Sequence, residues 1–87
     1  MTNQTAYDQA KAITDLYVAA IGYRGKSSGE VYALVMGLGV TLDNHLAVLR
    51  GLTSAGVLTE TSAHWLTLTG LGNEMFARLS ARETANA

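Results

Sequence analysis

The sequence predicts one small domain that is mainly helical and carries a single β-hairpin. Apolar residues recur with the helical period in four segments, and the period changes to that of a strand between Gly56 and Thr69. With 87 residues, the chain has the length of one domain. We therefore expect residues 1–87 to form one domain in the order helix, helix, helix, strand, strand, helix.

The first two helices follow from apolar spacing and from a capping signal. The first is expected over residues 1–22, because apolar residues share one stripe and Gly22 ends the pattern. Glycines, serines and cations in residues 22–29 predict a loop. Ser27 and Glu30 have the spacing of a capping box, so a short second helix should follow and end at Gly37.

The third helix is expected between Thr41, as its N-cap, and Gly56, as the left-handed residue that ends it. Its buried face is predicted from the residues that lie within about 60° of one direction. These are Leu42, His45, Leu46, Leu49, Leu52 and Thr53. His45 on this face and His64 in the hairpin are expected to have structural or surface roles.

The remaining elements are a hairpin and a last helix. β-Branched and alternating residues on both sides of a polar tip predict two short antiparallel strands within residues 57–68. Thr69 is expected to cap a helix over residues 69–83, whose apolar face contains Leu71, Met75, Phe76 and Leu79.

Composition argues against several classes of function. The chain has no cysteine, which excludes disulfides and thiolate metal sites, and its two histidines lack a metal-binding helical spacing. Gly70 and Gly72 lack the third glycine and the βαβ unit of a dinucleotide site. We expect no metal, no cofactor and no enzymatic activity. The longest uncharged apolar run, residues 31–40, is about half a bilayer span, so we expect a cytoplasmic protein without a membrane partner.

The second half of the chain carries a family resemblance. Leu49, Leu52, Gly56, Val57 and Leu58 give the spacing Leu-x-x-Leu-x-x-x-Gly-Val-Leu, and residues 68–72 give Leu-Thr-x-x-Gly. This pattern resembles winged helix-turn-helix regulators of the MarR and PadR kind over roughly residues 27–80. The resemblance implies a helix-turn-helix in residues 27–56 and a wing in residues 57–68. It also implies that the third helix enters the major groove of DNA while the wing touches the flanking backbone or minor groove.

Candidate DNA contacts follow from this comparison. Asn44 could bind adenine, Arg50 could reach a guanine or a phosphate, and Thr41 could donate to a phosphate. The N-terminus of the second helix favours an anion because of its free amides and its dipole. The full set of expected DNA-binding residues is Arg24, Lys26, Ser27, Ser28, Thr41, Asn44, Ala47, Arg50 and Gly51.

Charge leaves two functions open. Six Lys and Arg stand against seven Asp and Glu, and the expected wing tip carries Glu60 without a cation, whereas DNA-binding surfaces are usually basic. The first hypothesis is a small dimeric DNA-binding transcriptional regulator, a repressor that occupies its operator. The second is a winged-helix module, such as a phage- or plasmid-type inhibitor or adaptor, that binds a protein through its third helix and does not bind DNA.

Self-association is also expected from the first and last helices. The first helix is longer than a three-helix core needs, and its alanine-rich stripe suits close helix packing. We therefore predict a symmetric homodimer built from the first and last helices.

Overall fold

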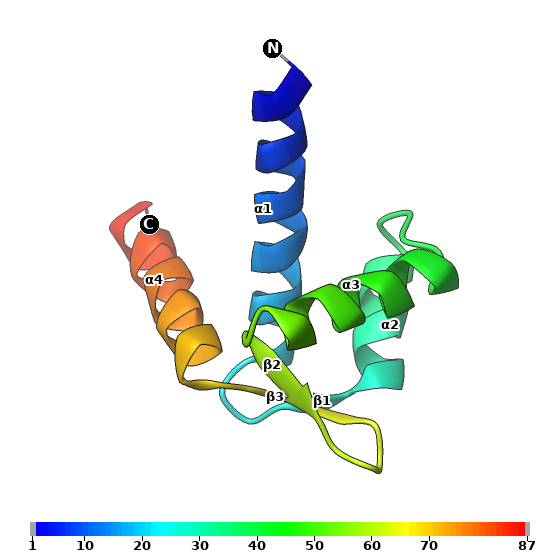
Figure 1. Ribbon diagram of the computed structural model, residues 1–87. Helices are drawn as coiled ribbons and strands as arrows, with labels where there is room; N and C mark the ends of the chain where they lie inside the picture. Colours follow the sequence, from blue (N-terminus) through cyan, green and yellow to red (C-terminus); the bar gives the residue numbers. More distant parts are fainter. Residues whose placement is uncertain (1, 87) are drawn as a thin grey trace.

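The computed structural model describes the backbone of residues 2–86 and the side chains of residues 6–82. This part of the chain has four helices and a small antiparallel sheet, and the sheet lies at one end of the molecule (Figure 1). The elements are α1 (Thr2–Ile21), β1 (Lys26–Ser27), α2 (Ser28–Met36), α3 (Leu42–Ser54), β2 (Leu58–Glu60), β3 (Trp65–Leu68) and α4 (Gly70–Asn86). Helices α1 and α4 extend from the sheet toward the same end of the molecule, and the hairpin lies at the opposite end.

The sheet has the strand order β1-β3-β2. The predicted hairpin is present, with Thr59 opposite Thr67 in β2 and β3. Strand β1 was missed, because sequence analysis placed Lys26 in a loop, whereas Lys26 pairs with Leu66 of β3. Two residues are too few to show a strand period, and the pairing depends on a strand about forty residues away. The predicted order of elements was therefore incomplete.

The core lies where α1, α2 and α3 meet the sheet. Its members are the apolar residues that are at most 7% exposed: Tyr17, Val18, Ile21, Val31, Val35, Leu49, Leu52, Val57, Leu58 and Leu66. Helix α4 contributes partly buried side chains only, from Met75, Phe76 and Leu79. Helix α4 therefore packs at the edge of the core, beside α1.

The predicted helix signals are confirmed. Ser27 Oγ accepts a hydrogen bond from the Glu30 amide at 3.2 Å, which is the N-cap half of the predicted capping box, and the Glu30 carboxylate accepts from the Ser27 hydroxyl in place of its amide. Thr41 Oγ1 accepts from the Asn44 amide at 3.2 Å. Gly56 has a φ of 79°, the left-handed conformation that ends α3. Helix α4 runs to Asn86, past the predicted limit at residue 83.

The predicted inward face of α3 was partly wrong. His45, Leu49 and Leu52 are buried, but Leu42 is 52% and Leu46 is 44% exposed, and Thr53 is exposed as well. Val48, on the other flank, is partly buried. The helix is therefore turned so that His45 and Leu52 point inward, and Leu42 and Leu46 lie at the edge of the buried face.

None of the helices in the described part of the chain is both long and apolar enough to cross a membrane.

Two helical glycines are predicted to respond in opposite ways to alanine. A Cβ at Gly72 would overlap the backbone carbonyl of Val57 and lie 3.0 Å from the Leu68 side chain, whereas a Cβ at Gly51 would meet nothing within 4 Å. We expect Gly72→Ala to destabilise the protein by about 1–3 kcal/mol because it overpacks. Gly51→Ala should stabilise it by up to about 1 kcal/mol through helix propensity. Urea unfolding of both variants tests this, and equal shifts would contradict the packing described here.

Candidate nucleic-acid interface

Helix α3 presents one side to solvent along its whole length. The side opposite His45, Leu49 and Leu52 is polar or has small side chains. The exposed residues on this side are Asp43, Asn44, Ala47, Arg50, Gly51 and Ser54. This surface, here called the α3 face, has one acidic and one basic side chain and is therefore close to neutral.

Five of the residues predicted to contact DNA lie at the α3 face. Asn44, Ala47, Arg50 and Gly51 are on its exposed side, and Thr41 stands at its N-terminus. The Thr41 oxygen already accepts from the Asn44 amide, but its O–H remains available as a donor. These five residues could therefore be reached together by one ligand.

The residues around the N-terminus of α2 are arranged differently. Arg24 is exposed and Lys26 is half-buried in β1, but Ser27 is engaged with Glu30 through both its donor and its acceptor. The Ser28 hydroxyl bonds to His45. The Glu30 carboxylate therefore already lies at this helix end, where sequence analysis expected an external anion.

A hollow of about 460 Å³ separates α3 from the hairpin. It is lined by Leu46, Leu49, Arg50, Thr53, Ser54 and Glu60. The Arg50 guanidinium would attract a phosphate at this place, whereas the Glu60 carboxylate would repel one. The apolar floor and the two opposite charges also match a protein segment.

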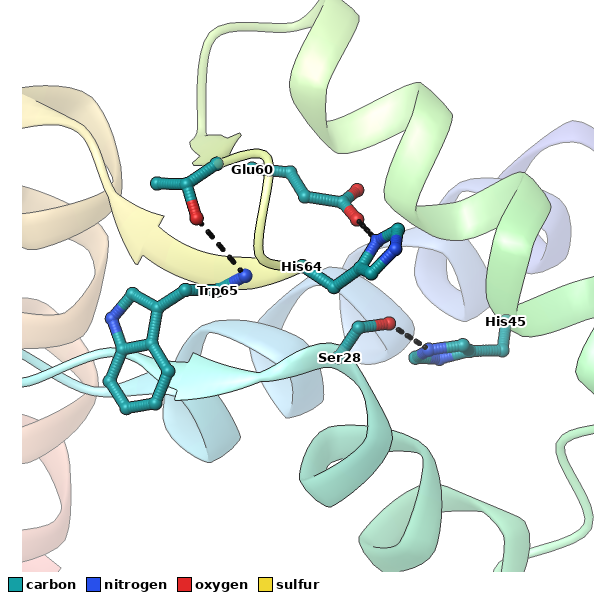
Figure 2. A network of polar contacts seen from close by, with 6 residues as sticks. Ser28, His45, Glu60, His64 and Trp65 are labelled. Carbon is teal, nitrogen blue, oxygen red and sulfur yellow. Dashed lines mark hydrogen bonds and ion pairs between the residues drawn. The ribbon is translucent and has the colours of Figure 1, made fainter.

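A buried polar network lies under the α3 face. His45 is 1% exposed, and its ring lies between two hydroxyl groups. The Tyr17 hydroxyl of α1 is 2.7 Å from His45 Nδ1. The Ser28 hydroxyl of α2 is 3.2 Å from Nε2 (Figure 2). The Tyr32 ring packs against the imidazole with a centroid distance of 5.1 Å. Through His45, α3 is thus hydrogen-bonded to both other core helices.

The same network continues into the hairpin. The Ser28 amide donates to the backbone carbonyl of His64 at 2.8 Å. His64 Nδ1 is 2.9 Å from a carboxylate oxygen of Glu60, and its φ of 59° is unusual for a residue with a side chain (Figure 2). We refer to Tyr17, Ser28, His45, His64 and Glu60 as the His45 network. It connects α1, α3, α2 and the hairpin in one chain of contacts.

Burial determines the charge states of His45 and Tyr17. It lowers the pKa of the His45 imidazole, because desolvation outweighs the opposing effects of the Ser28 backbone and of the Glu60 charge. Burial also raises the pKa of the Tyr17 hydroxyl. Both side chains are therefore neutral at pH 7, and their hydrogen bonds join neutral groups.

Among the described residues, no group of three or more His, Asp or Glu side chains is placed to hold a metal ion. No protein-family model, no curated protein and no solved structure matches this chain. Its function is therefore inferred from the surfaces and contacts described above.

Removing the Tyr17 hydroxyl should cost stability even though the ring stays in place. Tyr17→Phe leaves the buried Nδ1 of His45 without its partner, which typically costs about 1–3 kcal/mol. Tyr32→Phe is the matched control, because its ring also packs on His45 but its hydroxyl shows no hydrogen bond among the described residues. We expect the control to change the free energy of unfolding by less than about 0.5 kcal/mol. Similar effects of both substitutions in urea unfolding would argue against the Tyr17–His45 bond.

Proposed function

We propose that this chain is a cytoplasmic, dimeric winged-helix protein that binds double-stranded DNA and represses transcription by occupying its operator. One observation carries the proposal. One side of α3 packs into the core, and its opposite side is exposed near the β2–β3 hairpin. The strand β1 before α2 and the hairpin after α3 support the winged-helix assignment.

In this proposal α3 lies in the major groove, which is about 12 Å wide and admits a helix. Asn44 would form a bidentate contact with adenine, and Arg50 would bind a guanine or a phosphate. Ala47 and Gly51 would allow the helix to approach closely, since no atom lies within 4 Å of the place of a Gly51 Cβ.

The groove between α1 and α4 supports the proposed dimer. It has a volume of about 550 Å³ and is lined by Tyr7, Ala10, Lys11, Thr14, Asp15, Leu71, Met75, Arg78, Leu79 and Arg82. Tyr7 is 64% and Leu71 is 47% exposed, so a second copy would cover large apolar side chains there. Dimerisation would also bring together the cations of two copies, which a weakly charged DNA-binding protein needs.

A second candidate function is binding of a protein through the α3 face. The observation that favours it is the pair of exposed leucines, Leu42 and Leu46, beside a hollow that contains Glu60. Exposed apolar side chains of this size suit a protein surface better than a phosphate backbone.

DNA binding should depend on the cations near α3 and on salt. A duplex library is selected for binding, and affinity for the best sequence is measured at several salt concentrations. We expect log affinity to fall with log salt, with a slope of about −0.9 for each neutralised phosphate. Arg50→Ala should weaken binding, whereas Ala19→Glu, which changes the net charge by the same amount at an exposed site on α1, should not. Asn44→Ala should reduce discrimination at one base pair by about 1–3 kcal/mol.

The opposite pattern would favour the protein-binding candidate. A folded triple variant with glutamate at Arg24, Lys26 and Arg50 that keeps its biological activity would contradict DNA binding. In that case Ala47→Glu or Gly51→Leu should abolish binding of the partner while salt has little effect, because a filled surface excludes a partner regardless of charge.

The dimer is tested by sedimentation. We expect a mass close to twice the 9.2 kDa of one chain at micromolar concentration. Leu71→Glu should produce monomers, because it places a charge in the α1–α4 groove. Leu38→Glu is the matched control, since Leu38 is 69% exposed but lies between α2 and α3. A wild-type chain that stays monomeric at high concentration would refute the dimer.

A further inference from the structure

We infer that the His45 network is a proton-sensitive device that holds α3 and the hairpin in place at neutral pH and releases α3 when His45 becomes protonated. This inference rests on the proposed function only for its consequence, which is weaker partner binding in acid. The release of α3 itself is a property of the protein alone.

Protonation of His45 changes the number of hydrogen-bond donors in the network. A neutral imidazole has one donor and one acceptor nitrogen, and each hydroxyl can act in either role, so the Tyr17 and Ser28 contacts are both satisfied. A protonated imidazole has two donors. Both hydroxyls must then accept, and the Tyr17 hydrogen needs another acceptor, which the structure does not show among the described residues. Protonation therefore leaves a buried donor without a partner.

The groups around the His45 ring offer little charge to balance a protonated imidazole. The groups that face His45 are Tyr17 from α1, Ser28 and Tyr32 from α2, and Glu60 from β2. Glu60 is the only acid among them, and its carboxylate bonds to His64 at 2.9 Å. A positive imidazole would therefore be buried without an acid in contact, which proteins avoid. It can gain water only if α3 moves away from α1 and α2.

Docking of α3 is expected to weaken as the pH falls. Burial lowers the pKa of His45 below its ordinary value of about 6.5, so the docked arrangement binds fewer protons than the released one. Docking is complete above about pH 6.5 and weakens as the pH falls toward the lower pKa of the folded protein. The hairpin is affected too, because the Ser28 residue that bonds to His45 also holds the carbonyl of His64.

Nuclear magnetic resonance on the labelled wild-type chain tests the inference without DNA. The ring signals of both histidines and the amide protection factors of every helix are followed from about pH 7.5 to about pH 5. We expect protection in α3 to fall with the titration of His45, by up to about tenfold for each unit by which its pKa is lowered, while α4 keeps its protection. Equal loss of protection in α3 and α4 would overturn the inference. So would a loss of protection in α3 that coincides with the change in the His64 ring signals and not with the change in the His45 signals.

A non-titrating variant gives the second measurement. His45→Gln keeps a donor group and an acceptor group but cannot take up a proton in this pH range, so α3 should keep its protection down to about pH 5. His64→Gln is the matched control and should keep the wild-type pH dependence, because Ser28 bonds to the backbone carbonyl of His64, which the substitution leaves in place, and the His64 side chain is exposed. If the protection of α3 still falls with pH in His45→Gln, the inference is contradicted. If this variant does not fold, the measurement on the wild-type chain alone tests the inference. Both measurements are made without DNA, so a negative result would contradict the release of α3 and would not bear on whether the protein binds an operator.

Discussion

Helix α3 is oriented by a histidine that must keep two hydrogen bonds inside the core. A hydrogen bond contributes only about 1 kcal/mol in net terms, but a buried polar nitrogen without a partner costs about 1–3 kcal/mol. A rotation of α3 that buried Leu42 and Leu46 would pull His45 away from Tyr17 and Ser28. The helix instead leaves both leucines about half exposed. The buried bonds on one side thus determine which residues form the α3 face on the other.

This orientation limits how the α3 face could bind DNA. One copy has Arg50 and Asp43 on the α3 face and Glu60 across the hollow, whereas Arg24 and Lys26 come from the segment before α2. Nonspecific affinity grows with the number of neutralised phosphates, so such a protein would bind bulk DNA weakly. Most of its affinity for an operator would then come from base contacts and from the presence of two copies. A repressor of this kind would depend strongly on dimerisation and on the operator sequence.

Local signals made much of the fold predictable. Ser27 with Glu30, Thr41 and Gly56 each act on backbone groups within four residues, so their roles could be inferred from the sequence. Strand β1 and the His45 network could not, because each depends on partners that are distant in the chain. The exposed positions of Asn44 and Arg50 were predicted because they lie opposite the buried side of α3. The bond of the Ser28 hydroxyl to His45 was missed, since a hydroxyl near a helix N-terminus has the same sequence pattern whether it binds an external anion or a neighbouring side chain.

The two ends of the molecule are suited to different tasks. In Figure 1, α1 and α4 point away from the sheet, while α3 and the hairpin lie at the other end, so a second copy in the α1–α4 groove would leave the α3 face uncovered. The described chain measures 37 × 29 × 25 Å. A dimer that binds one duplex with both α3 helices would have to place them about 34–36 Å apart, which is the distance between successive major grooves on one side of DNA and is close to the longest dimension of one copy. A dimer through α1 and α4 is thus compatible with both helices binding one duplex, and the length of α1 would set the distance between the half-sites.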